Sequence, residues 1–206
     1  TRESGTVKIY IDGVVEGSGS NSTTFDFSGH KIGTWDETAD VSSKFSGIIA
    51  DFRTVVGTAV YTSNFTPPTA PLTDVTNTLA LVKGTNASII DKTQTTNIVR
   101  LQDNAKSSTT QYKYLTSSMY FDGTSDVINT STNCRLSIND FTLEAWIYPT
   151  QLDGNDCFIG EHWGGTTAGF IFRAHTNNYL SIFDGTQNQA STTVIATNQW
   201  QHVAAA

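Results

Sequence analysis

Apolar and polar residues alternate in short stretches along the whole chain, and the stretches end in tight-turn signals. Val7–Ile11 alternates and runs into Asp12-Gly13, after which a second apolar stretch begins at Val14. The same device returns at Asp122-Gly123 and at Asp184-Gly185. A period of two places successive side chains on opposite faces of a sheet, and Asp-Gly is a favoured hairpin turn. The pattern therefore predicts antiparallel strands joined by short turns.

The composition supports the same fold class over all 206 residues. The chain holds 33 Thr, 19 Ser and 14 Asn, which disfavour helix interiors and suit strands, turns and exposed sheet faces. About a dozen short strands with regular turn signals predict an all-β sandwich or barrel. The expected strands are Val7–Ile11, Val14–Val15, Thr23–Phe27, Lys31–Gly33, Gly47–Thr54, Thr78–Val82, Ile98–Leu101, Ser118–Phe121, Phe141–Tyr148, Phe158–Ile159, Gly169–Ala174, Tyr179–Phe183, Thr192–Ala196 and Gln201–Ala205.

The charge and hydropathy of the chain argue against two classes of partner. Its formal net charge is −7, and it has no basic stripe, so we expect no nucleic-acid partner. No apolar run approaches the roughly 20 residues of a membrane-spanning helix. We therefore expect no insertion into a membrane.

Three motifs in the second part of the chain form a specific series. Ser118–Gly123 reads SMYFDG, Asp140–Pro149 reads DFTLEAWIYP and Gln199–Ala204 reads QWQHVA. This series resembles the laminin G-like, or concanavalin A-like, jelly-roll domain of the lectin and glucanase superfamily. In the first part, Gly5–Gly13 and Ala59–Pro68 are similar to the closing strands of that family. The resemblance implies an antiparallel, two-sheet jelly-roll sandwich.

The order of these pieces is reversed relative to the family. There the WQHVA strand comes immediately before the strand similar to Gly5–Gly13, whereas here the first lies at the end of the sequence and the second at its beginning. Thr66–Val75 holds three of the four prolines and is typical of a boundary. We therefore expect residues 1–75 to be the C-terminal half of a laminin G-like domain and residues 76–206 the N-terminal half, together equivalent to one jelly roll. Two tandem repeats, a circular permutation and an arbitrary start in a periodic molecule all fit this order, and we favour an array or periodic molecule.

Glycanases share this sandwich, so the carboxylates decide whether the chain is expected to be an enzyme. Retaining glucanases of this type carry a Glu-x-Asp-x-x-Glu run, whose carboxyl groups lie about 5 Å apart. The sequence has no such run, and Glu144 stands alone in its strand. His202, in the WQHVA strand, is expected to have a structural role. We therefore expect no enzymatic activity.

Glycan binding is predicted from aromatic residues next to polar loops. Sugar rings stack on Trp, while Asp and Asn side chains bind their hydroxyl groups. Trp35 and Trp163 lie in loop-like sequences, and we select Asp36 and Asn155 as their polar neighbours. A loop tryptophan that only covers the end of a sheet is the alternative. The other two tryptophans lie in strand patterns and are expected in the core; they are Trp146 and Trp200.

Calcium is the one cofactor that the loops favour, because hard cations bind several carboxylate and carbonyl oxygens. The candidate ligands are Asp153, Asp156 and Asp40, and ordinary turn chemistry is the alternative for all three. The two cysteines, Cys134 and Cys157, do not form a disulfide framework. Two free buried thiols are expected, with a single bridge as the alternative.

The resemblance implies a non-enzymatic module for display or adhesion. The sequences of Ala59–Leu72, Ser117–Ile128 and Asp140–Pro149 are similar to repeats in bacteriophage structural proteins and in large bacterial surface proteins. Our first hypothesis is a phage virion protein, in a tail fibre or decorating a capsid, that binds a cell-surface glycan or neighbouring subunits. The second is a secreted bacterial adhesin or carbohydrate-binding repeat, and a glycanase is the third. We expect a place on the virion surface or outside the cell.

Overall fold

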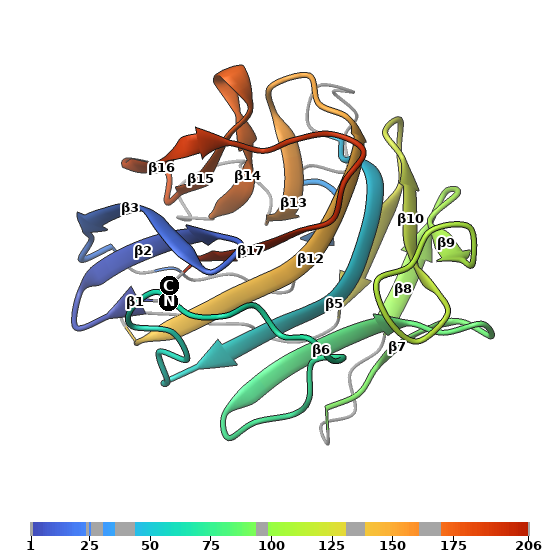
Figure 1. The fold of residues 1–206 in the computed structure, drawn as a ribbon, viewed down its shortest axis with the longest axis horizontal. Helices are drawn as coiled ribbons and strands as arrows, with labels where there is room; N and C mark the ends of the chain where they lie inside the picture. The colour runs from blue at the N-terminus through green and yellow to red at the C-terminus, as the bar shows by residue number, and fades with distance from the viewer. Residues whose placement is uncertain are drawn as a thin grey trace.

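The computed structural model describes residues 2–23, 25, 31–35, 44–93, 99–130, 139–160 and 170–205. These residues form two antiparallel sheets that pack face to face, and no α-helix occurs among them (Figure 1). The predicted all-β sandwich is therefore confirmed. The strands are β1 (Arg2–Glu3), β2 (Thr6–Ile11), β3 (Val14–Ser20), β4 (Lys31–Ile32), β5 (Ser46–Val56), β6 (Thr78–Gly84), β7 (Ile89–Asp91), β8 (Val99–Gln102), β9 (Lys106–Ser108), β10 (Ser118–Asp122), β11 (Val127–Thr130), β12 (Phe141–Gln151), β13 (Asp156–Gly160), β14 (Ile171–His175), β15 (Tyr179–Phe183), β16 (Asn188–Val194) and β17 (Gln201–Ala205).

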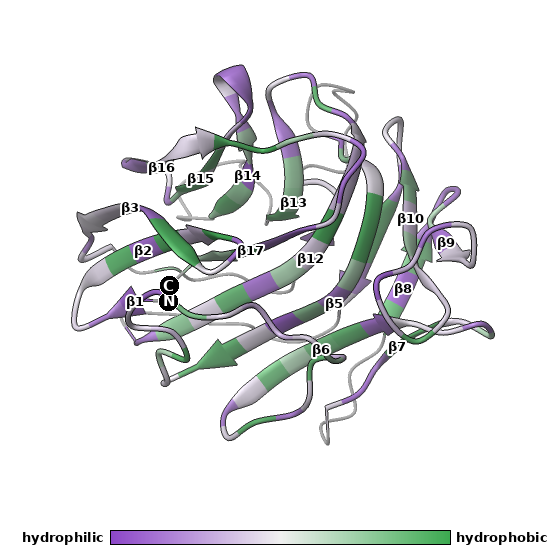
Figure 2. Cartoon of the chain, viewed as in Figure 1, coloured by the Kyte–Doolittle hydropathy of each residue, from purple (hydrophilic) through white to green (hydrophobic). Residues whose placement is uncertain are grey.

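The larger sheet is built around two long strands, β5 and β12, which pair along most of their length. Its order is β1-β2-β17-β12-β5-β10-β9, with β3 on β2. The far edge of β5 is shared, because β10 pairs with its first half and β6 with its second. Asp51 lies between these two pairings with a positive φ of 51°, and the register with β12 shifts there. Figure 2 shows hydrophobic residues along β5 and β12, interrupted by hydrophilic ones.

The smaller sheet has the order β16-β15-β14-β13-β4-β11-β8. Its strands alternate as predicted: Phe172 and Ala174 of β14 face the core, whereas Arg173 between them faces outward. Buried phenylalanine rings fill the space between the sheets in edge-to-face contacts, such as those of Phe45 with Phe121 and Phe158. The inward-facing apolar side chains of both sheets thus form one hydrophobic core between them.

Each sheet contains strands from residues 1–75 and strands from residues 76–206. In the larger sheet, β17 lies between β2 and β12. Ala205 pairs with Leu143 and Arg2 pairs with Phe141, so both ends of the described chain lie along the same edge of β12. The two segments therefore complete the same two sheets. That they correspond to the two halves of a family repeat stays a prediction.

The predicted Asp12-Gly13 hairpin joins β2 to β3. Gly13 has a φ of +79°, and a Cβ atom there would lie 1.9 Å from the carbonyl oxygen of Phe65. Phe65 also bonds to the turn directly, because its backbone N–H donates a hydrogen bond to the Gly13 carbonyl oxygen at 2.9 Å. Glycine is required here for the turn and for the segment that crosses it.

That crossing segment, residues 57–73, is a proline-rich strap over the outer face of the larger sheet. Its backbone bonds to side chains of the sheet: Val60 N–H donates to Thr142 Oγ1 at 2.9 Å, and Leu72 N–H donates to Asp51 Oδ2 at 2.9 Å. Aromatic rings pack beneath it, with Tyr61 stacked on Phe65 at 3.6 Å between ring centroids. Proline is tolerated in the strap because the strap is held by backbone-to-side-chain hydrogen bonds and does not need the regular N–H donors of a β-strand.

Glu144 is the centre of the contacts below the strap and has no exposed surface. Its Oε1 accepts a hydrogen bond from Arg53 Nε at 2.9 Å, and its Oε2 accepts one from Tyr61 Oη at 2.8 Å. His202 Nε2 lies 3.1 Å from the same Oε2. Burial disfavours the charged carboxylate, but the hydrogen bond to His202 and the charge of Arg53 outweigh it and lower the pKa of Glu144. His202 therefore has the structural role expected for it.

Replacing Glu144 with Ala should destabilise the fold by about 3–5 kcal/mol, because Arg53 would remain buried without its partner. The matched control is Glu3→Ala, which removes an exposed ion pair with Lys8 and should cost within about 1 kcal/mol. Urea unfolding of the three proteins measures both values. Equal midpoints for the two variants would contradict the structural role of Glu144.

Candidate binding site

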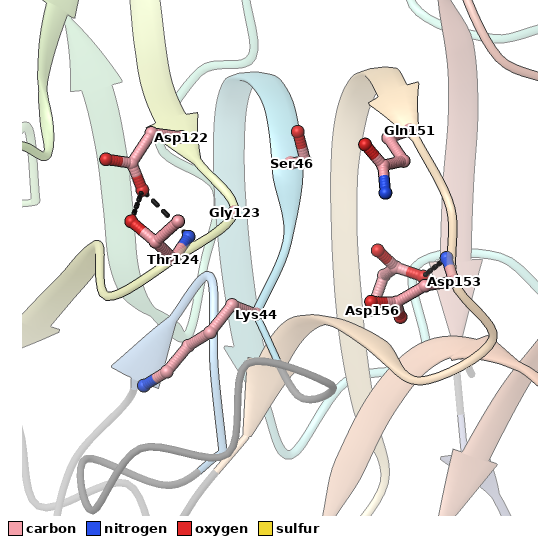
Figure 3. Close-up of a pocket in the computed structure, with 8 residues that line it drawn as sticks. All are labelled: Lys44, Ser46, Asp122, Gly123, Thr124, Gln151, Asp153 and Asp156. Carbon is pink, nitrogen blue, oxygen red and sulfur yellow. Dashed lines mark hydrogen bonds between the residues drawn. The ribbon is translucent and has the colours of Figure 1, made fainter.

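A pocket of about 340 Å³ opens at one end of the sandwich, where several strands begin or end. Asp122 ends β10, Ser46 begins β5, Gln151 ends β12 and Asp156 begins β13. The turn residues Gly123 and Thr124, together with Lys44 and Asp153, complete the lining. Figure 3 shows Asp153 and Asp156 together on one side of the pocket and Asp122 with Thr124 on the other.

Asp122 is held by the turn that follows it. Its Oδ1 accepts hydrogen bonds from the backbone N–H of Thr124 at 2.8 Å and from the Thr124 hydroxyl at 2.7 Å. Burial by itself would raise the pKa of Asp122, but these hydrogen bonds outweigh it and lower the pKa. The Oδ2 of Asp122 accepts a further hydrogen bond from the Asn104 side-chain amide at 3.1 Å, so both oxygens of this ionised carboxylate already have protein partners.

Asp156 is only 2% exposed, although it lines the pocket. Its Oδ2 accepts hydrogen bonds from the backbone N–H groups of Asp153 at 2.9 Å and Gly154 at 3.2 Å, which shapes the loop between β12 and β13. Desolvation outweighs these bonds, and the neighbouring charge of Asp153 adds to it, so the pKa of Asp156 rises to about 6. The Asp156 carboxyl therefore titrates about two pH units above an ordinary aspartate.

This raised pKa makes a pH-dependent contribution to folding. The folded state binds the Asp156 proton more tightly than the unfolded chain, so the contribution is full below about pH 4 and is lost as the pH rises through about 6. Asp156→Asn keeps a hydrogen-bond acceptor and removes the titration. Its stability relative to the wild type should increase by roughly 2–3 kcal/mol between about pH 4 and pH 7. Parallel curves of unfolding free energy against pH would contradict this.

The calcium prediction is met only in part by the geometry. Asp153 and Asp156 lie on the same loop, whereas Asp40 lies outside the described residues. Within the described part of the chain, no three His, Cys, Asp or Glu side chains come together as a group that could hold a metal ion. One of the two Asp156 oxygens is also committed to the backbone of its own loop. A calcium site built from these three aspartates stays a prediction.

An aromatic and polar cluster occupies the outer face of the smaller sheet, on the other side of the same loop. Arg173 of β14 lies over two rings, with its guanidinium carbon 5.6 Å from the ring centroids of both Trp35 and Phe183. Its Nη1 donates to Asn155 Oδ1 at 3.2 Å. We call these four residues, Trp35, Asn155, Arg173 and Phe183, the Arg173 cluster. All four are partly exposed.

A glycine in β13, the strand next to β14, leaves space for the Trp35 side chain. A Cβ atom on Gly160 of β13 would lie 2.6 Å from the Cβ atom of Trp35, so a larger residue there would displace it. Cys157, which pairs with Arg173 in the ladder, is a free and fully buried thiol. Burial raises its pKa. Its proposed alternative partner, Cys134, lies outside the described residues.

Two of the four predicted glycan-binding residues meet in this cluster, because Arg173 bridges Trp35 and Asn155. The other two, Asp36 and Trp163, lie outside the described residues. Trp146 is buried, but on the outer face of the larger sheet, where its ring contacts His202 and Tyr114. Trp200 is partly buried beside Tyr148 and not in the core between the sheets.

Sequence reasoning missed Arg173, Phe183 and the pocket residue Asp122. A signal for the first was present, because Arg173 is the one charged residue in an alternating apolar strand and must point away from the core. The Asp122-Gly123 pair was recognised only as a turn. The position of Asp122 across the pocket from Asp153 depends on the pairing of β10 with β5 and of β5 with β12.

Residues 122–206 match the model of the concanavalin A-like lectin/glucanases superfamily. The match covers β11 to β17, which include every strand of the smaller sheet except β4 and β8. Neither the curated proteins nor the solved structures contain a significant match to the chain. No helix in the described part of the chain is long and apolar enough to cross a membrane.

Proposed function

Because the chain carries a laminin G-like, concanavalin A-like domain, a class of carbohydrate- or ligand-binding modules, we propose that it is a non-enzymatic module that binds a glycan. The Arg173 cluster is the observation that carries this proposal. It presents a partly exposed indole face next to an amide and a guanidinium, on the outer face of one rigid sheet. An aromatic platform with a few fixed polar groups is the arrangement that sugar rings require.

The carboxylates support binding and not hydrolysis. Glu144 is fully buried under the strap and accepts hydrogen bonds from Arg53 and Tyr61. In the pocket, Asp122 and Asp156 accept hydrogen bonds from their own turns. These three carboxylates are thus held by the protein's own donors, which supports a binding role over glycoside hydrolysis by two free carboxyl groups.

The proposed setting is the surface of a phage particle, in a tail fibre or a capsid decoration, where the domain binds a cell-surface glycan or neighbouring subunits. Its surface chemistry is compatible with this setting, since Thr, Ser and Asn supply about a third of the chain and charged residues only 15%. A secreted bacterial adhesin or carbohydrate-binding repeat is the second candidate. Both place the domain outside the cell and use the same cluster.

Trp35→Ala should weaken binding of the best saccharide in a broad glycan panel by at least about tenfold, because the stacking surface is lost. The matched control is Tyr112→Ala, which removes a 47% exposed aromatic side chain from the loop between β9 and β10 and should leave the affinity unchanged. Titration calorimetry gives the affinities, and ligand-dependent melting temperatures give an independent check.

Two results would overturn the proposal. Either no member of the panel binds the wild-type protein, or the two variants lose affinity equally. In the first case a purely structural role in an assembly would replace glycan binding.

A further inference from the structure

We propose that the glycan bound at the Arg173 cluster is acidic, with carboxylate or sulfate groups that pair with Arg173 and with further cations on the same sheet face. This inference rests on the proposed glycan-binding function and names its ligand class. It begins from the charge of Arg173, which has no counter-ion among the residues that the structure describes.

Arg173 is partly buried, yet its polar contacts are neutral. Its one hydrogen bond goes to the Asn155 amide, its two ring contacts are to Trp35 and Phe183, and no ion pair to it is found among the described residues. Its Nε is buried without a hydrogen-bond partner. Desolvation by burial lowers the pKa of Arg173, as expected for a guanidinium without an anionic partner among the described residues. A guanidinium in this state gains most from an anion.

Arg53, one of the two buried arginines among the described residues, is paired differently. Arg53, on the outer face of the larger sheet, donates to the Glu144 carboxylate and to the carbonyl oxygen of Thr73. Arg173 also faces outward, on the smaller sheet, but has no carboxylate partner within the described ranges. The planar guanidinium matches the two oxygens of a carboxylate or sulfate, and aromatic rings on either side fix its orientation.

Further cations lie along the same face. Strand pairing places Ile171, Gly160, Lys31, Asn129 and Arg100 in one row across β14, β13, β4, β11 and β8. Arg173 stands two residues from the start of this row, on the same face. The row holds two cations and no carboxylate among these described strand residues, in a chain whose formal net charge is −7.

The geometry of the row suits an extended anion. β14 and β8 are four strand spacings apart, which is about 19 Å. A chain of acidic sugars that stacks on Trp35 can therefore reach Lys31 and Arg100 in turn. A neutral sugar would leave the Arg173 charge uncompensated.

The experiment compares saccharides that differ only in charge. The probes are an oligogalacturonate, its fully methyl-esterified form as the matched neutral control, and an oligosaccharide of dextran sulfate with neutral dextran as its own control. Affinities for the full chain are measured by calorimetry at 50 and 200 mM NaCl. We expect at least one acidic probe to bind tenfold or more tightly than its neutral control and to weaken as salt increases.

Variants then locate the anion. Arg173→Gln should lose at least tenfold in affinity for the acidic probe, while Arg173→Lys should retain part of it. Arg100→Gln, at an exposed edge position where folding is not at risk, should reduce both the affinity and its salt dependence. Lys106→Gln, which removes an exposed cation from β9 of the larger sheet, is the control and should change neither.

The outcomes separate the two proposals. Binding of neutral and acidic probes with equal affinity would overturn the acidic ligand and leave glycan binding standing. Failure of every saccharide, including the broad panel, would overturn both. Tighter binding of the uronate or of the sulfated probe supports the inference and identifies which anion the cluster takes.

Discussion

The buried carboxylate of Glu144 connects three strands and the strap. It lies on β12 and accepts hydrogen bonds from Arg53 of β5 and Tyr61 of the strap, with His202 of β17 beside it. Taking such a charge out of water costs several kcal/mol, and that cost is offset only while the donors stay in place. These elements therefore cannot shift past one another without leaving a charge unpaired. The centre of the larger sheet is fixed by this requirement.

The same principle separates the two outer faces of the sandwich. On the larger sheet, charged side chains are satisfied internally: Arg53 by Glu144 and Asp51 by the Leu72 amide with Lys83 nearby. On the smaller sheet, Arg173 has aromatic neighbours and one amide but no carboxylate among the described residues. The strap covers the first face, whereas the second face carries the partly exposed Arg173 cluster that we propose as the binding site.

The loop between β12 and β13 links the two parts of the candidate site. Asp153 and Asp156 point into an acidic pocket on one side, and Asn155 reaches the Arg173 guanidinium on the other. The raised pKa of Asp156 places its titration near neutral pH, so the charge of the pocket side varies while that of Arg173 does not. A ligand that binds along the sheet face thus meets a loop whose shape is set by the buried carboxyl of Asp156.

Local sequence patterns determined the strands, the Asp-Gly turns and the inward set of side chains, because alternation and turn chemistry act between near neighbours. They also showed that Glu144 is not part of a Glu-x-Asp-x-x-Glu motif, and they indicated Trp35 and Asn155 as candidate glycan-binding residues. Only the tertiary structure placed Arg173 between Trp35 and Phe183, Asp122 opposite Asp153, and the proline-rich strap over Glu144. These contacts join residues that are distant in the chain, and they depend on strand order. Strand order follows from burial of the whole core and of its charges, which no single stretch of sequence encodes.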